Sequence, residues 1–160
     1  AGHGTLQSMQ AYWKNTLGWK SPGYNTWIDY DGTPNKLSSY ENVTNGVAGF
    51  NSQCLHICYR GGVEQTNVNK AKDTRTQAQK DGILKEILLM KEWLFQNGND
   101  LKNVMIVGHY HFSDDKNKNG AIESWERIKN CPSFDAYAEY SYLMEAENPL
   151  YHKLKLPKNR

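Results

Sequence analysis

The sequence predicts an α/β fold in which a mixed β-sheet is flanked by helices. Three observations support this class: two short segments with strand patterns, a long amphipathic segment with a helix start signal, and an apolar run typical of a buried strand. A chain of 160 residues is long enough for one domain with a hydrophobic core.

The first predicted element is a helix within residues 5–19. Leu6, Met9 and Trp13 recur there at helical spacing, so they are expected to line one face. Turn signals at Pro22-Gly23 and Asp31-Gly32 then bracket a short strand around Thr26–Tyr30.

Residues 33–50 are polar and are predicted to form a loop. The segment 53–62, QCLHICYRGG, is predicted to be a strand that ends at Gly61-Gly62. Alternation places its side chains on two faces, with Leu55, Ile57 and Tyr59 on one and Cys54, His56 and Cys58 on the other.

The clearest predicted element is a long helix that begins at Thr76. Thr76 and Gln79 have the spacing of a capping box, and Gly98 provides a stop. The expected buried face consists of Ile83, Ile87, Leu88 and Leu94.

The apolar run 103–109, NVMIVGH, predicts a strand covered on both faces. Such a strand would deliver His109 to its C-terminal end, where functional groups of α/β sheets gather. A last helix is expected within residues 133–144.

Composition excludes several functional classes. There are 19 Lys and Arg against 17 Asp and Glu, and no basic run indicates nucleic acid or an anionic membrane. No stretch approaches the roughly 20 apolar residues of a membrane span. Three cysteines do not form a closed disulfide framework, and Ala1 does not begin a signal peptide, so the chain indicates no export route.

Residues 115–126, DKNKNGAIESWE, have the residue pattern of an EF-hand calcium loop. Asp115, Asn117, Asn119 and Glu126 occupy positions one, three, five and twelve, and Gly120 is at the sixth. The flanking segments do not look like EF-hand helices, so the stretch is interpreted as an insertion that either binds Ca²⁺ or forms a ligand-free turn.

Three residues around this insertion suggest metal chemistry. His109 precedes it, and Lys129 and Cys131 follow it two residues apart. Imidazole and thiolate are ligands that Zn²⁺ accepts, and a nearby lysine can reach the same cavity. Taken alone, this spacing also occurs by chance.

A set of motifs in a fixed order makes the interpretation more specific. GYNTWIDYDGT, NGVAGFNSQCLHICYRGG, KDTRTQAQ, IVGH and IKNCPSFD run from residue 23 to residue 135. In this order they resemble the zinc-dependent N-acetylmuramoyl-L-alanine amidases, which include amidase-type phage lysozymes and peptidoglycan recognition proteins. The likeness is greatest to versions from Bacteroides-type bacteria and their phages.

The resemblance implies a mixed sheet flanked by helices, with an amidase-like domain over residues 1–142 and a C-terminal tail over residues 143–160. It implies hydrolysis of the amide between N-acetylmuramic acid and L-alanine in peptidoglycan, with muropeptides as ligands. By position, His109 and Cys131 match two of three zinc ligands, Lys129 matches the oxyanion-stabilising lysine, and Tyr24 matches the tyrosine beside the metal-bound water.

The chain departs from the family pattern at the first zinc ligand. The family carries that histidine on an N-terminal strand that this sequence lacks, which leaves His3 as the nearby substitute. Asn25 stands where the family has a histidine, and GHYH replaces GHRD, so His111 is a second candidate for the missing ligand. A metal trap formed by His56, Cys54 and Cys58 is a further alternative.

Two functions therefore remain open. The first is a peptidoglycan amidase, and the second is a peptidoglycan-binding module that has lost the zinc chemistry. A partner protein that reuses the fold is a third. Because the absent strand would leave its neighbour unpaired, we expect the chain to form a homodimer or to pair that edge with another segment.

Overall fold

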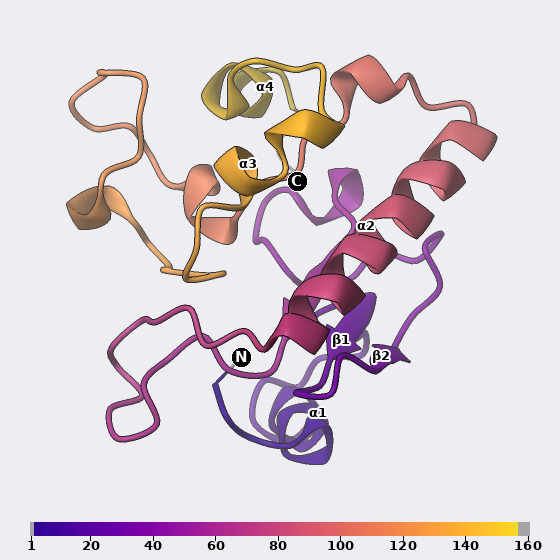
Figure 1. Ribbon diagram of the computed structural model, residues 1–160, viewed down its shortest axis with the longest axis vertical. Coiled ribbons are helices and arrows are strands. Elements are labelled where there is room, and N and C mark those ends of the chain that lie inside the picture. Colours follow the sequence, from indigo (N-terminus) through magenta and orange to yellow (C-terminus); the bar gives the residue numbers. More distant parts are fainter. Residues whose placement is uncertain (1, 157–160) are drawn as a thin grey trace.

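The fold contains a three-stranded sheet in the order β2–β1–β3, and Figure 1 shows β1 and β2 beside α2. The computed structural model describes residues 2–156. Strand β1 (Thr26–Ile28) pairs antiparallel with β2 (Pro34–Lys36) and parallel with β3 (Ile57–Tyr59). The predicted mixed α/β class is confirmed, and β1 and β3 lie in the two segments predicted as strands. The prediction of an uninterrupted loop over 33–50 is wrong, because Pro34–Lys36 forms an edge strand on β1.

Helix α2 (Gln77–Gln96) forms where the sequence predicts the long helix, and it packs against β1 and β3 (Figure 1). The capping box is present: Thr76 Oγ1 accepts from the Gln79 backbone N–H at 3.0 Å, and Gln79 Oε1 accepts from the Thr76 N–H at 3.0 Å. The helix ends just before Gly98, whose φ of +81° is a conformation that glycine adopts without strain.

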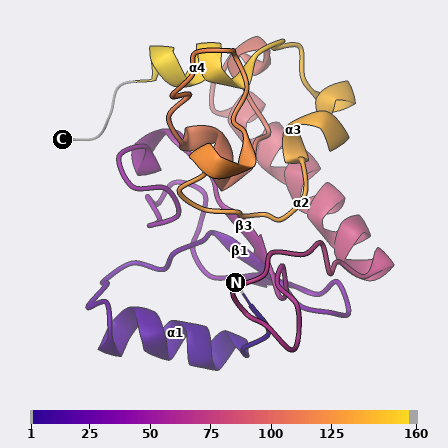
Figure 2. The same cartoon turned by 90° about the vertical axis from the view of Figure 1, so that its left-hand side faces the viewer.

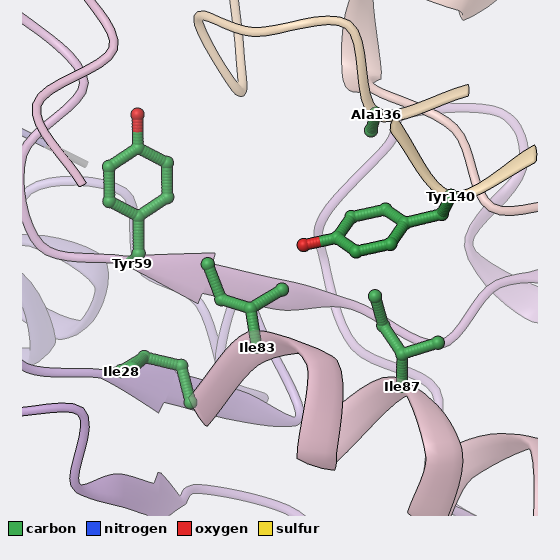
Figure 3. Close-up of a cluster of buried hydrophobic side chains, with 6 residues drawn as sticks. All are labelled: Ile28, Tyr59, Ile83, Ile87, Ala136 and Tyr140. Carbon is green, nitrogen blue, oxygen red and sulfur yellow. The ribbon is translucent and has the colours of Figure 1, made fainter. Parts of the chain in front are cut away.

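The hydrophobic core fills the space between α2, the sheet and α3 (Ala136–Glu139), as Figure 3 shows. Its buried members are Ile28, Tyr59, Ile83, Ile87, Ala136 and Tyr140. The prediction that Leu88 is buried is wrong, because its side chain is 48% exposed. One residue of helix turns a side chain by about 100°, which carries Leu88 away from the face that Ile87 occupies.

Helix α1 (Leu6–Asn15) confirms the first predicted helix. Thr5 caps it by accepting from the Ser8 N–H, and Trp13 is its buried residue. The indole of Trp13 packs against the rings of Trp19 and Tyr24, so α1 helps to position Tyr24.

The predicted strand over 103–109 is wrong. Residues 104–108 form no ladder with another strand, and His109–Phe112 forms a 3₁₀ helix. The Ile106 N–H donates to Met144 Sδ at 2.9 Å instead of to a carbonyl of a neighbouring strand. A strand needs a partner at hydrogen-bonding distance, and within residues 2–156 the second edge of β3 pairs with no other strand.

The C-terminal part differs from the single helix predicted over 133–144. It consists of the one-turn helix α3, a 3₁₀ helix at Ser141–Leu143, and α4 (Pro149–Lys155) within the predicted tail. Lys153 Nζ donates to the Ser113 carbonyl at 2.5 Å, which fixes α4 beside the 3₁₀ helix at 109–112. Figure 2 shows α4 at the opposite end of the molecule from α1. Residues 157–160 of the predicted tail lie outside the described residues.

Within residues 2–156, no helix is both long enough and apolar enough to cross a bilayer.

A candidate site in the central cavity

A cavity of about 970 Å³ lies alongside β3. The segment 104–109 and the turn 130–132 form further parts of its wall. Tyr24, His109 and Cys131, which come from three distant sequence motifs, all line it. The structure therefore brings three of the predicted site residues to one cavity.

Tyr24 is held in the wall by aromatic packing. Its ring meets that of Trp13 edge to face, with 5.5 Å between the centroids. The nearby thiol groups of Cys58 and Cys131, together with burial, raise the pKa of Tyr24 well above its ordinary value. The phenol is therefore protonated at neutral pH, and the Cys58 thiol is its hydrogen-bonding neighbour.

Cys131 is positioned by hydrogen bonds of its neighbours in the chain. The Tyr59 hydroxyl donates to the Pro132 carbonyl at 2.7 Å, and Ser133 Oγ donates to the Gly62 carbonyl at 2.6 Å. Both contacts fasten the turn that carries Cys131 over the C-terminal end of β3. Cys131 itself is an exposed free thiol at the cavity rim.

His109 begins the 3₁₀ helix that replaces the predicted strand end. Burial lowers the pKa of His109, and the positive charge of Lys129 lowers it further. Lys129 itself is exposed and does not line the cavity, so this electrostatic effect on His109 is what connects it with the site. A neutral imidazole at pH 7 can accept a proton or bind a metal ion.

The two candidates for the missing ligand have other partners. His3 Nδ1 lies 2.5 Å from the Tyr30 hydroxyl, and His3 Nε2 lies 2.7 Å from the Val63 carbonyl oxygen. His111 Nδ1 accepts from the Gly108 N–H at 3.1 Å. His109 and His111 do not lie on an extended segment, where residues two apart would share a face, because His109–Phe112 is a 3₁₀ helix.

His56, which the sequence suggested only as part of a metal trap with Cys54 and Cys58, is a buried residue of the cavity wall. Its side chain is 8% exposed, and Nδ1 lies 2.7 Å from Thr44 Oγ1. The backbone N–H of His56 donates to Asn25 Oδ1 at 2.8 Å. Nε2 is buried and has no hydrogen-bond partner within residues 2–156.

Burial and the neighbouring charge of His109 lower the pKa of His56 to about 4. The alternation in 53–62 already placed His56 and Cys58 on the face opposite Tyr59. The alternation could not predict that the loop around Gly46 covers this face. The Gly46 backbone lies so close to the imidazole that a Cβ at this position would be 2.7 Å from His56 Nε2.

The donors present do not complete a zinc site. His109 and Cys131 are suitable ligand types, but catalytic zinc uses three protein ligands. Within residues 2–156, no group of three or more His, Cys, Asp or Glu side chains is placed to hold a metal ion, and this includes the trio of Cys54, His56 and Cys58. Zinc binding remains a prediction.

The calcium-type loop is folded around its own carboxylates. Asp115 accepts from the backbone N–H groups of Asn119 and Gly120 at 3.2 and 2.8 Å. Glu126 is 2% exposed and accepts from the N–H groups of Lys116 and Asn117 at 2.7 and 3.3 Å. These hydrogen bonds form a compact turn without a bound ion, which is the alternative to a calcium loop. Ca²⁺ binding remains a prediction.

The structure is a mixed α/β domain whose cavity is lined in part by imidazole and thiol groups. Comparison with known sequences identifies the family to which the chain belongs. No protein-family model matches the chain, and no solved structure matches it. An uncharacterized protein of Haemophilus influenzae is 30% identical over 92 residues, which cover 58% of this chain and 72% of that protein. The chain belongs to the same family as this protein. Because that protein is itself uncharacterized, the relationship assigns no activity.

Proposed function

We propose that the chain is an N-acetylmuramoyl-L-alanine amidase domain that hydrolyses the amide bond between N-acetylmuramic acid and L-alanine in peptidoglycan. One observation carries this proposal. Tyr24, His109 and Cys131 come from separate motifs of the resemblance and line one cavity, and the charge of Lys129 acts on His109. In this proposal the domain has an amidase-like fold and acts on the bacterial cell wall.

The side chains around the cavity suit hydrolysis of an amide. The carbonyl oxygen of the substrate gains negative charge as the tetrahedral intermediate forms, and fixed donors stabilise it there. Lys129 supplies a cation, and Tyr24 supplies a phenol that stays protonated. The neutral imidazole of His109 can bind a metal ion or accept a proton.

The proposal includes zinc binding by two residues but no catalytic step on the metal. His109 and Cys131 are assigned as two ligands, and His3, the candidate for the third, does not line the cavity. Because His3 is engaged with Tyr30 and Val63, and residues 2–156 contain no group of three suitable side chains, we assign no catalytic step to the metal.

Release of dye from labelled peptidoglycan, with and without added Zn²⁺, tests the hydrolase. We expect dye release by the wild-type chain and a loss of about a hundredfold or more in His109→Ala, because a ligand or proton acceptor at the reacting centre is removed. Lys85→Ala on α2 is the control and should retain activity, because Lys85 is exposed and does not line the cavity. The absence of dye release at every Zn²⁺ concentration would contradict the hydrolase.

A second function is favoured by two specific observations. Asn25 replaces the histidine of the resembled family, and residues 2–156 hold no three-ligand group. Both suit a peptidoglycan-binding module without turnover. Sedimentation of the protein with insoluble sacculi tests this: binding without dye release supports the module, and no binding supports a partner protein that reuses the fold.

One structural observation supports the predicted homodimer. The second edge of β3 pairs with no strand within residues 2–156, and unpaired edges favour association. Residues 143–156 of the tail do not pair with this edge, and Lys153 of α4 donates to the Ser113 carbonyl. Sedimentation equilibrium would show the dimer, and a monomer at all concentrations would contradict it.

A further inference from the structure

The second edge of β3 belongs to the wall of the central cavity. On the first edge, β1 pairs with β3 in a parallel register, and the Thr26 N–H donates to the His56 carbonyl at 3.2 Å. Backbone groups of a strand alternate in direction, so those of Ile57 and Tyr59 point away from β1. Both residues line the cavity, and within residues 2–156 no strand pairs with this edge.

A second backbone segment with unpaired amides lines the same cavity. Residues 104–108 are extended at both ends, with φ −85° and ψ 126° at Val104 and φ −81° and ψ 160° at Gly108. Every second N–H has a partner: that of Val104 donates to a carbonyl at 3.1 Å, that of Ile106 to a thioether at 2.9 Å, and that of Gly108 to an imidazole at 3.1 Å. The amides between them, of Met105 and Val107, have no acceptor within residues 2–156.

The two segments lie in one layer over α2. Ile57 and Ile106 both pack against the core cluster that contains Ile83 and Ile87. In Figure 3 these two side chains point from α2 toward β3, and Met90 of the same helix also lines the cavity. Two extended segments and an apolar helix face therefore bound the cavity, as the neighbours of a strand in a sheet that is packed on a helix would.

The walls of the cavity lack both apolar cover and backbone partners. Its volume of about 970 Å³ is far larger than the water-sized voids of ordinary protein interiors. Val104, Met105, Ile106 and Val107 are apolar but only half-buried. Buried backbone N–H and C=O groups are almost always paired in native proteins. A ligand that brings apolar side chains together with backbone donors and acceptors would satisfy both needs.

We propose that the space between β3 and residues 104–107, which we call the strand slot, binds an extended segment of a partner polypeptide as an additional β-strand. The two rows of backbone groups identify the occupant, because another extended backbone offers N–H and C=O groups at strand spacing on both of its edges. Every second side chain of the segment would face Ile83, Ile87 and Met90, so these positions should be apolar.

The strand slot is separate from the residues of the proposed function. Tyr24, His109 and Cys131 belong neither to its two backbone rows nor to α2, so the added strand and a substrate use different walls of the cavity. The inference therefore does not depend on the proposed hydrolase, and none of its tests uses activity.

Binding of a model strand tests the slot. The probe is an acetylated and amidated heptapeptide that alternates valine and threonine, and amide hydrogen exchange of the whole chain is followed by NMR. With saturating peptide, we expect the amides of Ile57, Met105 and Val107 to exchange at least roughly tenfold more slowly, because they gain acceptors. Unchanged exchange of these amides, or no binding of the peptide, would overturn the proposal.

A methylated peptide distinguishes strand pairing from simple burial of apolar side chains. N-methylation of alternate backbone amides keeps the side chains of the probe and removes the donors along one edge. We expect this peptide to bind at least roughly tenfold more weakly, the scale of one or two lost hydrogen bonds. Equal affinity of the two peptides would show an apolar cavity without strand pairing, and the proposal would fail.

Two lysine substitutions on α2 provide a matched pair. Leu94 is half-buried and lines the cavity, whereas Leu89 is 41% exposed and does not line it. We expect Leu94→Lys to weaken peptide binding by roughly tenfold, because a charge is placed against apolar side chains, and Leu89→Lys to leave it unchanged. Equal effects of the two substitutions would contradict the slot.

A second copy of the chain is the competing occupant, because the predicted homodimer uses the same edge of β3. Sedimentation equilibrium and hydrogen exchange without peptide separate the two. Fast exchange of the Ile57, Met105 and Val107 amides in the free chain supports a slot that awaits a partner strand. Slow exchange of the same amides in a dimer would show that a second copy fills the slot and would overturn the partner polypeptide.

Discussion

Two buried polar groups lie beside the central sheet, and their surroundings differ. Glu86 of α2 is 1% exposed and accepts hydrogen bonds from Thr26, Lys36 and Tyr40. His56, just before β3, is 8% exposed and has a partner at Nδ1 but none at Nε2 within residues 2–156. The Glu86 carboxylate is saturated with internal hydrogen bonds, and we call its surroundings the saturated region. The His56 imidazole is not saturated, and we call its surroundings the open region.

This difference separates structural polar groups from candidate functional ones. Burial alone would raise the pKa of Glu86, but the hydrogen bonds from Lys36, Thr26 and Tyr40 outweigh it and lower the pKa. The carboxylate is thus stabilised as an ion and fastens α2 to β1 and β2. Tyr24 and His109 line the same cavity as His56. Buried groups left without partners in a native fold call for an explanation.

The largest expected effect is on the saturated region. Glu86→Ala should lower the free energy of unfolding by about 3–4 kcal/mol, because it leaves the Thr26 and Tyr40 hydroxyls and the Lys36 ammonium without their shared acceptor. Urea unfolding measures this. Glu92→Ala, an exposed glutamate on the same helix, is the control and should change stability by less than about 0.5 kcal/mol. Similar losses in both variants would show that the network contributes little.

The second prediction concerns the pH dependence of stability at His56. Its pKa is about 4 in the folded protein against an ordinary 6.5, so the unfolded chain binds more protons between these values. The contribution is fully present above pH 6.5 and is lost as pH falls toward 4, up to about 3 kcal/mol. Urea unfolding across this range should show a flatter pH profile for His56→Gln. An unchanged profile would mean that His56 is not desolvated.

The third prediction tests whether the open region carries the chemistry. In the hydrolase, Lys129→Ala should lower turnover by roughly a hundredfold, the scale of one lost oxyanion donor, while muropeptide affinity changes little. In a binding module the same variant should weaken affinity instead. Lys85→Ala, an exposed lysine on α2, controls for loss of charge. If neither turnover nor affinity responds, Lys129 has no role in the site.

The smallest expected effect concerns metal content. Chelator-treated protein dialysed against Zn²⁺ should retain well below one equivalent, since two protein ligands bind more weakly than three or four. His3→Ala should leave this content unchanged, because both ring nitrogens of His3 are engaged elsewhere. Elemental analysis measures it. One full equivalent that disappears in His3→Ala would show that His3 leaves Tyr30 and Val63 to bind the metal.

Local sequence signals predicted the elements whose stabilising contacts are themselves local. The capping box of Thr76 and Gln79 and the stop at Gly98 were correct, because these contacts lie within a few residues of each other. The helix at α1 and the strands β1 and β3 were recognised from periodicity and flanking turns. Ordered motifs also led to Tyr24, His109 and Cys131, which do line one cavity.

Tertiary structure decided whatever needed a distant partner. Residues 103–109 have the apolar composition of a strand, but a strand exists only where another backbone supplies its ladder, and within residues 2–156 none does. Pro34–Lys36 looked like loop, yet it pairs with β1. The isolation of His56 Nε2 likewise depends on where Thr44 and Gly46 fold across it. Composition and periodicity describe one segment at a time, whereas ladders, burial and unpaired atoms arise between segments.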